Sequence, residues 1–72
     1  MRVALRDGLP HRVALEDGRP RAVRGVLDAW RVGNRWWRRE TPSDHYLLDL
    51  DGDLVAEVFV QDGHWRLERI LD

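Results

Sequence analysis

Few side chains in this sequence are suited to catalysis, and no spacing joins them into a site. A hydrolytic triad needs a nucleophile, a base and an acid that orients the base. The candidate hydroxyls and imidazoles are Thr41, Ser43, His11, His45 and His64. Ser43 lies between Pro42 and Asp44, where the chemistry of a turn explains its presence. The sequence therefore predicts a protein that is not an enzyme.

A short run of acids is the nearest approach to a metal site. Asp49, Asp51 and Asp53 alternate as they do at the start of a calcium-binding EF-hand loop. Such a loop needs Gly at its sixth position and Glu at its twelfth, where this sequence has Leu54 and Val60. A hairpin turn with solvated acids explains the run better. Because the sequence also lacks Cys and a glycine-rich phosphate loop, we expect neither a metal nor a cofactor.

Arginine and tryptophan are concentrated in one segment near the middle of the chain. The residues are Arg31, Arg35, Trp36, Arg38 and Arg39. Guanidinium groups that contact phosphates, together with an indole that stacks on a base, commonly hold single-stranded nucleic acid. In a second interpretation Arg31 and Arg38 cover the Trp36 ring as cation–π partners, and no ligand is involved. The leading hypothesis is a non-enzymatic accessory domain that binds single-stranded nucleic acid through these residues.

Turn dipeptides divide the chain into the short apolar segments that must position these groups. The dipeptides are Asp7-Gly8, Asp17-Gly18, Gly33-Asn34, Asp51-Gly52 and Asp62-Gly63. Residues of these types adopt the positive φ that two-residue hairpin turns require. The intervening segments predict strands at residues 2–6, 11–16, 21–32, 35–40, 45–51, 54–61 and 64–70. The expected fold is all-β, a small antiparallel meander that forms a barrel or sandwich (SH3-like or a similar roll), with one short helical turn at residues 26–30 as an alternative.

Two-residue turns assign the strands to faces, because side chains alternate along a strand. A turn at Gly33-Asn34 sets Trp30 opposite Trp37 and leaves Trp36 on the outside. The core face predicted from this turn holds Val26, Trp30, Val32 and Trp37. A turn at Asp62-Gly63 predicts a second core face that holds Leu47, Leu54, Ala56, Val58, Val60, Trp65 and Leu67, with Ala56 opposite Arg69.

The reverse of this second face is apolar but interrupted by charges. The apolar members are Tyr46, Leu48, Leu50, Val55, Phe59 and Ile70. The same register places the like charges of Glu57 and Glu68 directly opposite each other. Such a face is either covered by the N-terminal strands or exposed as an interface. The alternative function is therefore a protein-interaction or homo-oligomerisation module that uses Tyr46, Val55, Phe59 and Ile70.

The size of the chain predicts one domain, residues 1–72, with a thin core. Residues 2–10 and 12–20 form an imperfect repeat, which predicts a strand-turn extension at residues 1–19 ahead of the main part at 20–72. Charged residues interrupt the apolar start of the chain where a signal peptide would be continuous, and no segment is long enough to span a bilayer. We expect a cytoplasmic protein with no membrane partner.

Charge is distributed unevenly along the chain. Residues 1–39 carry ten Arg and four acids, whereas residues 40–72 carry two Arg and nine acids. This split indicates either a surface with one positive and one negative end, or neighbouring strands of opposite charge that pair with each other.

Several aromatic and apolar landmarks lie between residues 20 and 72. They are Val-Arg-Gly-Val-Leu-Asp-Ala-Trp at residues 23–30, Trp36-Trp37, Tyr46, and Gly-His-Trp-Arg-Leu-Glu-Arg-Ile-Leu-Asp at residues 63–72. In these landmarks the chain resembles the small bacterial domains of unknown function known as DUF6504. The resemblance implies a shared fold, no catalytic residues, and a setting in mutagenic DNA repair beside Y-family polymerase-like proteins. The resemblance makes a repair polymerase-like protein one expected partner, and the thin core and the apolar reverse face make a second copy of this chain the other.

Overall fold

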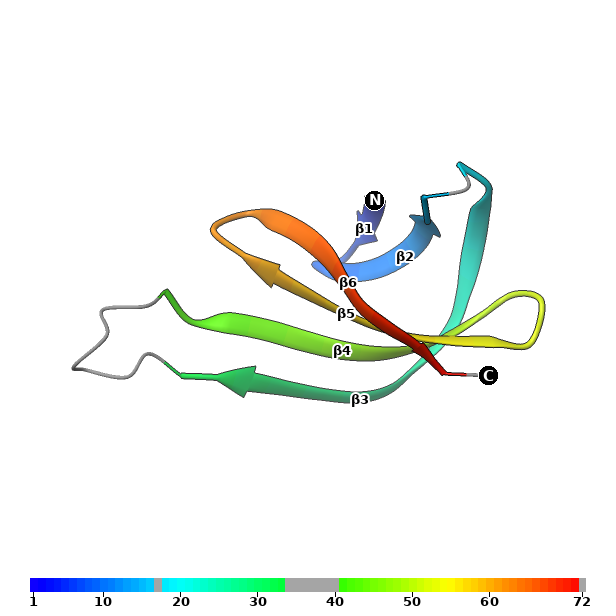
Figure 1. The fold of residues 1–72 in the computed structure, drawn as a ribbon. Coiled ribbons are helices and arrows are strands. Elements are labelled where there is room, and N and C mark those ends of the chain that lie inside the picture. Colours follow the sequence, from blue (N-terminus) through cyan, green and yellow to red (C-terminus); the bar gives the residue numbers. More distant parts are fainter. Residues whose placement is uncertain (17, 34–40, 72) are drawn as a thin grey trace.

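The computed structural model describes residues 1–16, 18–33 and 41–71, in which the strands form one antiparallel sheet in chain order (Figure 1). The strands are β1 (Arg2–Arg6), β2 (Leu9–Ala14), β3 (Pro20–Val32), β4 (Ser43–Leu50), β5 (Leu54–Gln61) and β6 (His64–Leu71). The sheet curls into a half-barrel, which confirms the predicted all-β meander. The predicted strand 35–40 lies outside the described residues. The described part contains no helix long and apolar enough to cross a membrane.

Two hairpin turns form as the Asp-Gly dipeptides predict. Asp7 has a φ of 53° and Gly8 a φ of 79°, and Asp62 and Gly63 have φ values of 53° and 75°. Positive φ at both central residues matches the right-handed twist of the strands on either side. These turns connect β1 to β2 and β5 to β6.

β3 is long, and different parts of it pair with different neighbours. Its first residues, Pro20 to Ala22, pair with β2, whereas the part from Val23 to Val32 pairs with β4. The register to β4 shifts at two places, where Arg24 and Leu27 have no partner. Such irregularities increase the local twist of a strand. They lie where the sheet curls, and the extended conformation of residues 26–30 shows that the helical alternative was wrong.

The core lies on the inner, concave side of the sheet. Its buried apolar side chains are Val13, Leu15, Leu48, Leu50, Ala56 and Val58. Val13 on β2 is fully buried, so the N-terminal part of the chain packs into the core.

The predicted faces of β4 were wrong because the turn to β5 is one residue longer than expected. Leu50 pairs with Leu54, which places Leu48 opposite Ala56 and Tyr46 opposite Val58. Since a shift of one residue turns every side chain of a strand to the other face, Leu48 and Leu50 are in the core and Leu47 is not.

The predicted core face on β3 was also wrong. Val26, Trp30 and Val32 are 38%, 37% and 48% exposed. These side chains are exposed because, in the described structure, this part of β3 pairs with β4 on one side and with no strand on the other. Trp37, the fourth member, lies outside the described residues.

One irregularity replaces an expected repulsion with an ion pair. Val60 lies opposite Trp65 and Val58 opposite Leu67, as predicted, but Glu57 lies opposite Arg69. Glu68 is the additional residue at this point, and the register shift places Ile70 rather than Arg69 opposite Ala56. Arg69 Nε donates a hydrogen bond of 3.1 Å to Glu57 Oε1.

Candidate functional site

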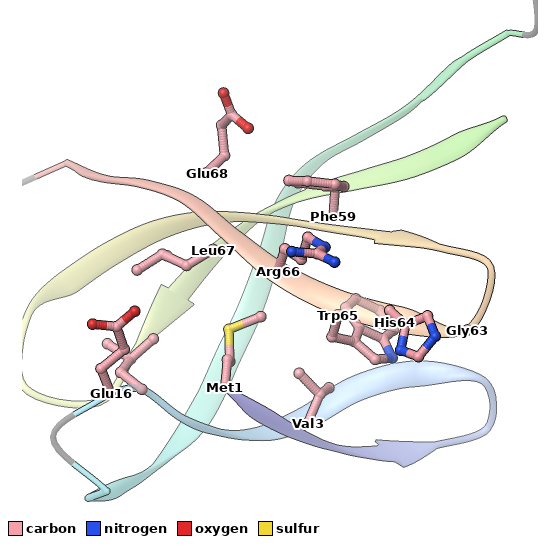
Figure 2. Close-up of a pocket in the computed structure, with 11 residues that line it drawn as sticks. Met1, Val3, Glu16, Phe59, Gly63, His64, Trp65, Arg66, Leu67 and Glu68 are labelled. Atoms are coloured by element: carbon pink, nitrogen blue, oxygen red, sulfur yellow. The ribbon is translucent and has the colours of Figure 1, made fainter. Parts of the chain in front are cut away.

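The half-barrel is open on one side, where a cleft of about 700 Å³ lies between β1 and β6 (Figure 2). The two strands are the ends of the sheet, and each pairs with one neighbour in the described structure. Met1 and Val3 approach the cleft from the N-terminal side, and Trp65 and Leu67 approach it from β6. These four side chains are partly buried and pack against the core. The floor of the cleft is therefore an apolar extension of the core, whereas most of the surface that lines the cleft is polar.

Charged side chains of both signs surround this apolar floor. Glu16 and Glu68 contribute carboxylates, whereas Arg66 and His64 contribute basic groups. Arg2 and Arg6 lie exposed on the adjacent edge strand β1. The mixture does not form a surface of one sign.

A row of stacked rings crosses the outer face of the sheet. The ring centroids of Trp30 and His45 are 5.5 Å apart with an angle of 14° between the planes, and those of His45 and Phe59 are 5.2 Å apart at 20°. The register places these residues side by side on β3, β4 and β5. Trp30 ends the row at a strand edge with no described neighbour beyond it.

The imidazole of His45 is fixed within this row. Its Nε2 lies 2.9 Å from Ser43 Oγ, and its Nδ1 is buried without a hydrogen-bond partner among the described residues. The row was not predicted, because a two-residue turn at Gly33-Asn34 assigns Trp30 to a core face. With the correct register of β4, alternation along the strands places Trp30, His45 and Phe59 on the same outer face, and this pattern would have predicted the row.

The residues predicted to bind nucleic acid are only partly described. Arg31 Nε donates a hydrogen bond of 2.7 Å to Asp44 Oδ1, and Arg31 Nη2 lies 3.3 Å from Asp44 Oδ2. These hydrogen bonds, and then the positive charge of Arg31, lower the pKa of Asp44 below its ordinary value. Arg35, Trp36, Arg38 and Arg39 lie outside the described residues. The nucleic-acid hypothesis therefore remains a prediction.

The four residues predicted to form an interface do not share one surface. Tyr46 is on the inner side, where its ring centroid lies 5.6 Å from that of Trp65. Ile70 pairs with buried Ala56 and is therefore also on the inner side, at 45% exposure. Val55 and Phe59 alternate with buried Ala56 and Val58 and are on the outer side. The shifted register of β4 and the irregularity in β6 account for the separation.

The acidic run that resembles a calcium loop is engaged with a cation of the protein itself. Arg24 Nη2 lies 2.9 Å from Asp49 Oδ1 and 3.2 Å from Asp53 Oδ1. Within residues 1–16, 18–33 and 41–71, no three acidic, His or Cys side chains gather as a metal site.

Comparison with known proteins gives no relative from which a site could be transferred. No protein-family model, no curated protein and no solved structure matches this chain, and the resemblance to DUF6504 stays a prediction from the sequence.

Proposed function

We propose that this protein is an interaction module that accepts an extended segment of a partner protein as an added strand in the cleft. The observation that carries the proposal is that β1 and β6, each with one unpaired edge in the described structure, lie on the two sides of a cleft with an apolar floor. This function is the protein-interaction alternative expected from the sequence, but the binding site is the cleft between β1 and β6 and not the predicted interface residues.

The backbone supplies the attraction along these edges. A strand at the end of a sheet leaves alternate N–H and C=O groups unpaired, and these groups are a template for another extended chain. β6 is the longer edge with eight residues, against five for β1. Because the meander alternates in direction, β1 and β6 run in opposite directions, and a segment antiparallel to β6 would lie parallel to β1.

The side chains of the cleft define the partner segment. Successive side chains of a strand point to opposite faces, so every second residue of the segment would face Val3, Trp65 and Leu67. Those positions favour apolar side chains, whose burial is stabilising at about 25 cal/mol per Å² of apolar surface. The resemblance noted above makes a repair polymerase-like protein the first partner to examine.

The experiment selects short peptides from a display library on the folded protein and maps their footprint by amide hydrogen exchange. We expect selected peptides to protect amides of β1 and β6 and to change the fluorescence of Trp65. Val3→Lys should abolish binding because it places a charge on the apolar floor of the cleft. Leu9→Lys, at a side chain of β2 that is 50% exposed and does not line the cleft, is the matched control.

Circular dichroism of both variants establishes that they are folded. Peptides that bind equally well to wild type and Val3→Lys, or that protect amides elsewhere and leave β1 and β6 unchanged, would show the proposed site to be wrong.

Binding of single-stranded nucleic acid is the second candidate function. The observation in its favour is that the exposed indole of Trp30 precedes, on the same stretch of chain, the Arg-rich segment at residues 35–39. Fluorescence anisotropy of a labelled single strand should then show binding that weakens as salt is raised. Binding that is unchanged in Trp36→Ala and Arg38→Ala would reject this function.

A further inference from the structure

A second free edge lies away from the cleft, on the outer half of β3. Residues 24–32 of this strand have β4 on one side and, in the described structure, no strand on the other (Figure 1). Val26, Leu27, Trp30 and Val32 are among its side chains and are all more than one third exposed. A long, apolar edge strand of this kind is a preferred site for pairing with another chain.

The edge carries three charged residues, Arg24, Asp28 and Arg31, and the two arginines form ion pairs within the fold. Asp28 Oδ1 accepts a hydrogen bond of 2.8 Å from the backbone N–H of Ala29. Arg31 is held by Asp44 on the neighbouring strand. Pairing within the fold therefore weakens the charges with which exposed strands usually prevent self-association, and Asp28 is the remaining charge that a second strand must accommodate.

The ring stack of the outer face ends at this same edge. Phe59 and Trp30 are its two ends, and His45 lies between them. The β3 edge beyond Trp30 has no described neighbour, and His45 is the one ring recorded against the indole among the described residues. A second ring in that position would extend the stack and bury apolar surface.

Symmetry limits how two copies can pair along β3. In an antiparallel pair with a two-fold axis perpendicular to the sheet, the residue at the axis faces its own copy. Each residue before the axis then faces the residue at the same distance after it in the other copy. An axis at Asp28 or Arg31 would set like charges opposite each other, which is destabilising. An axis at Ala29 would set Trp30 opposite Asp28. An axis at Trp30 sets the two indoles together, Ala29 opposite Arg31, and Asp28 opposite Val32.

We infer that the outer edge of β3 binds a second copy of this chain, paired antiparallel about Trp30. The two ring rows join into one stack of six rings across the dimer. This surface is separate from the cleft, and the dimer leaves β1 and β6 available to a partner.

The experiment uses engineered thiols, because the chain contains no Cys of its own. Opposed residues of an antiparallel pair have Cα atoms about 4.5–5.5 Å apart, within the range of a disulfide. Neither Ala29→Cys nor Arg31→Cys should cross-link with itself, whereas an oxidised mixture of the two variants should yield a covalent dimer. Trp30 is retained in both variants.

Sedimentation equilibrium gives the strength of the association. Trp30→Ala should weaken the dimer about tenfold or more, because it removes the central pair of rings. Leu9→Lys, at an exposed side chain on β2, should leave the dissociation constant unchanged. Circular dichroism establishes that each variant is folded.

Three outcomes would overturn the inference. They are a monomer at millimolar concentration, a dimer in which the mixed thiols fail to cross-link, and a monomer whose Trp30 fluorescence is quenched by a single-stranded oligonucleotide. The last result would assign the exposed indole to a nucleobase.

Discussion

Glu57 is a buried carboxylate on β5 whose described ion-pair partner, Arg69, is mostly exposed. We predict that Arg69→Ala lowers the free energy of unfolding by about 1–2 kcal/mol, because it leaves a desolvated carboxylate without its donor. Urea denaturation measures the change. Adding Glu57→Gln to this variant should recover part of the loss, whereas Arg66→Ala, at an exposed side chain of the same strand, should have little effect.

A second charge pair makes stability depend on acid pH. Because Arg31 lowers the pKa of Asp44 in the folded protein, the ionised carboxylate is favoured more by the folded than by the unfolded state. The stabilising contribution is therefore present above the unfolded pKa of about 3.9 and is lost as the pH falls through the lower folded value.

The measurement is an NMR titration of the Asp44 carboxyl group. In Arg31→Ala the pKa of Asp44 should rise toward its ordinary value, and the midpoint of acid unfolding should move to higher pH. An unchanged pKa in the variant would contradict the prediction.

At the scale of the elements, the sequence predicts which strands exist better than it predicts their register. The Asp7-Gly8 and Asp62-Gly63 turns and the pairs Val60–Trp65 and Val58–Leu67 follow from turn chemistry and alternation. Asp51-Gly52 looks the same in sequence, yet Asp53 joins the turn with a φ of 58°. Nothing in the residue types distinguishes the two turn lengths, and one residue decides which leucines of β4 enter the core.

Irregularities in pairing are hidden from the sequence for a similar reason. Glu68 has no sequence signal that marks it as an extra residue, and alternation counted through it pairs Glu57 with the wrong side chain. Arg24 and Leu27 similarly interrupt the count along β3. The candidate cleft could not be predicted, because it depends on how far the sheet curls and not on any motif.

The register of β4 and β5 gives a contrast between two deletions. Deleting Asp53 should leave a two-residue Asp-Gly turn that keeps Leu50 opposite Leu54, so the change in stability should be less than about 1 kcal/mol. Deleting Val55 should abolish cooperative unfolding. The loss of one residue within β5 means that Leu54 cannot face the core together with Ala56 and Val58, so one of these two groups must turn outward. Near-ultraviolet circular dichroism and urea denaturation check both. Two deletions of equal effect would show the register to be wrong.

For the whole molecule, the core is assembled from both ends of the chain. Val13 from the N-terminal repeat is fully buried against side chains of β4 and β5. We predict that Val13→Ala lowers the free energy of unfolding by about 2 kcal/mol, from lost burial and the cavity left behind. Val32→Ala, at a side chain that is 48% exposed, should cost less than about 0.5 kcal/mol as measured in a monomeric preparation.

Removing residues 1–19 is the stronger form of this test. The truncated chain should lose its cooperative thermal transition, because Leu48 and Leu50 would face water on the inner side of the sheet. A truncated chain that still melts cooperatively would mean that residues 20–72 fold independently.

The bend in β3 has a mechanical consequence. β1 and β2 are attached to the remainder of the sheet by three register pairs on β3, and a hydrogen bond of 2.9 Å from Asp51 N–H to the carbonyl of Ala22 holds this part of β3 to the turn after β4. Arg24 and Leu27, at the two register shifts, stand between this attachment and the edge that carries Trp30. If a bound molecule separates β1 from β6, β3 bends at Arg24 and Leu27. The part of the protein that contains β1 and β2 then moves relative to the edge that carries Trp30. Occupancy at one end would then alter affinity at the other, equally in both directions.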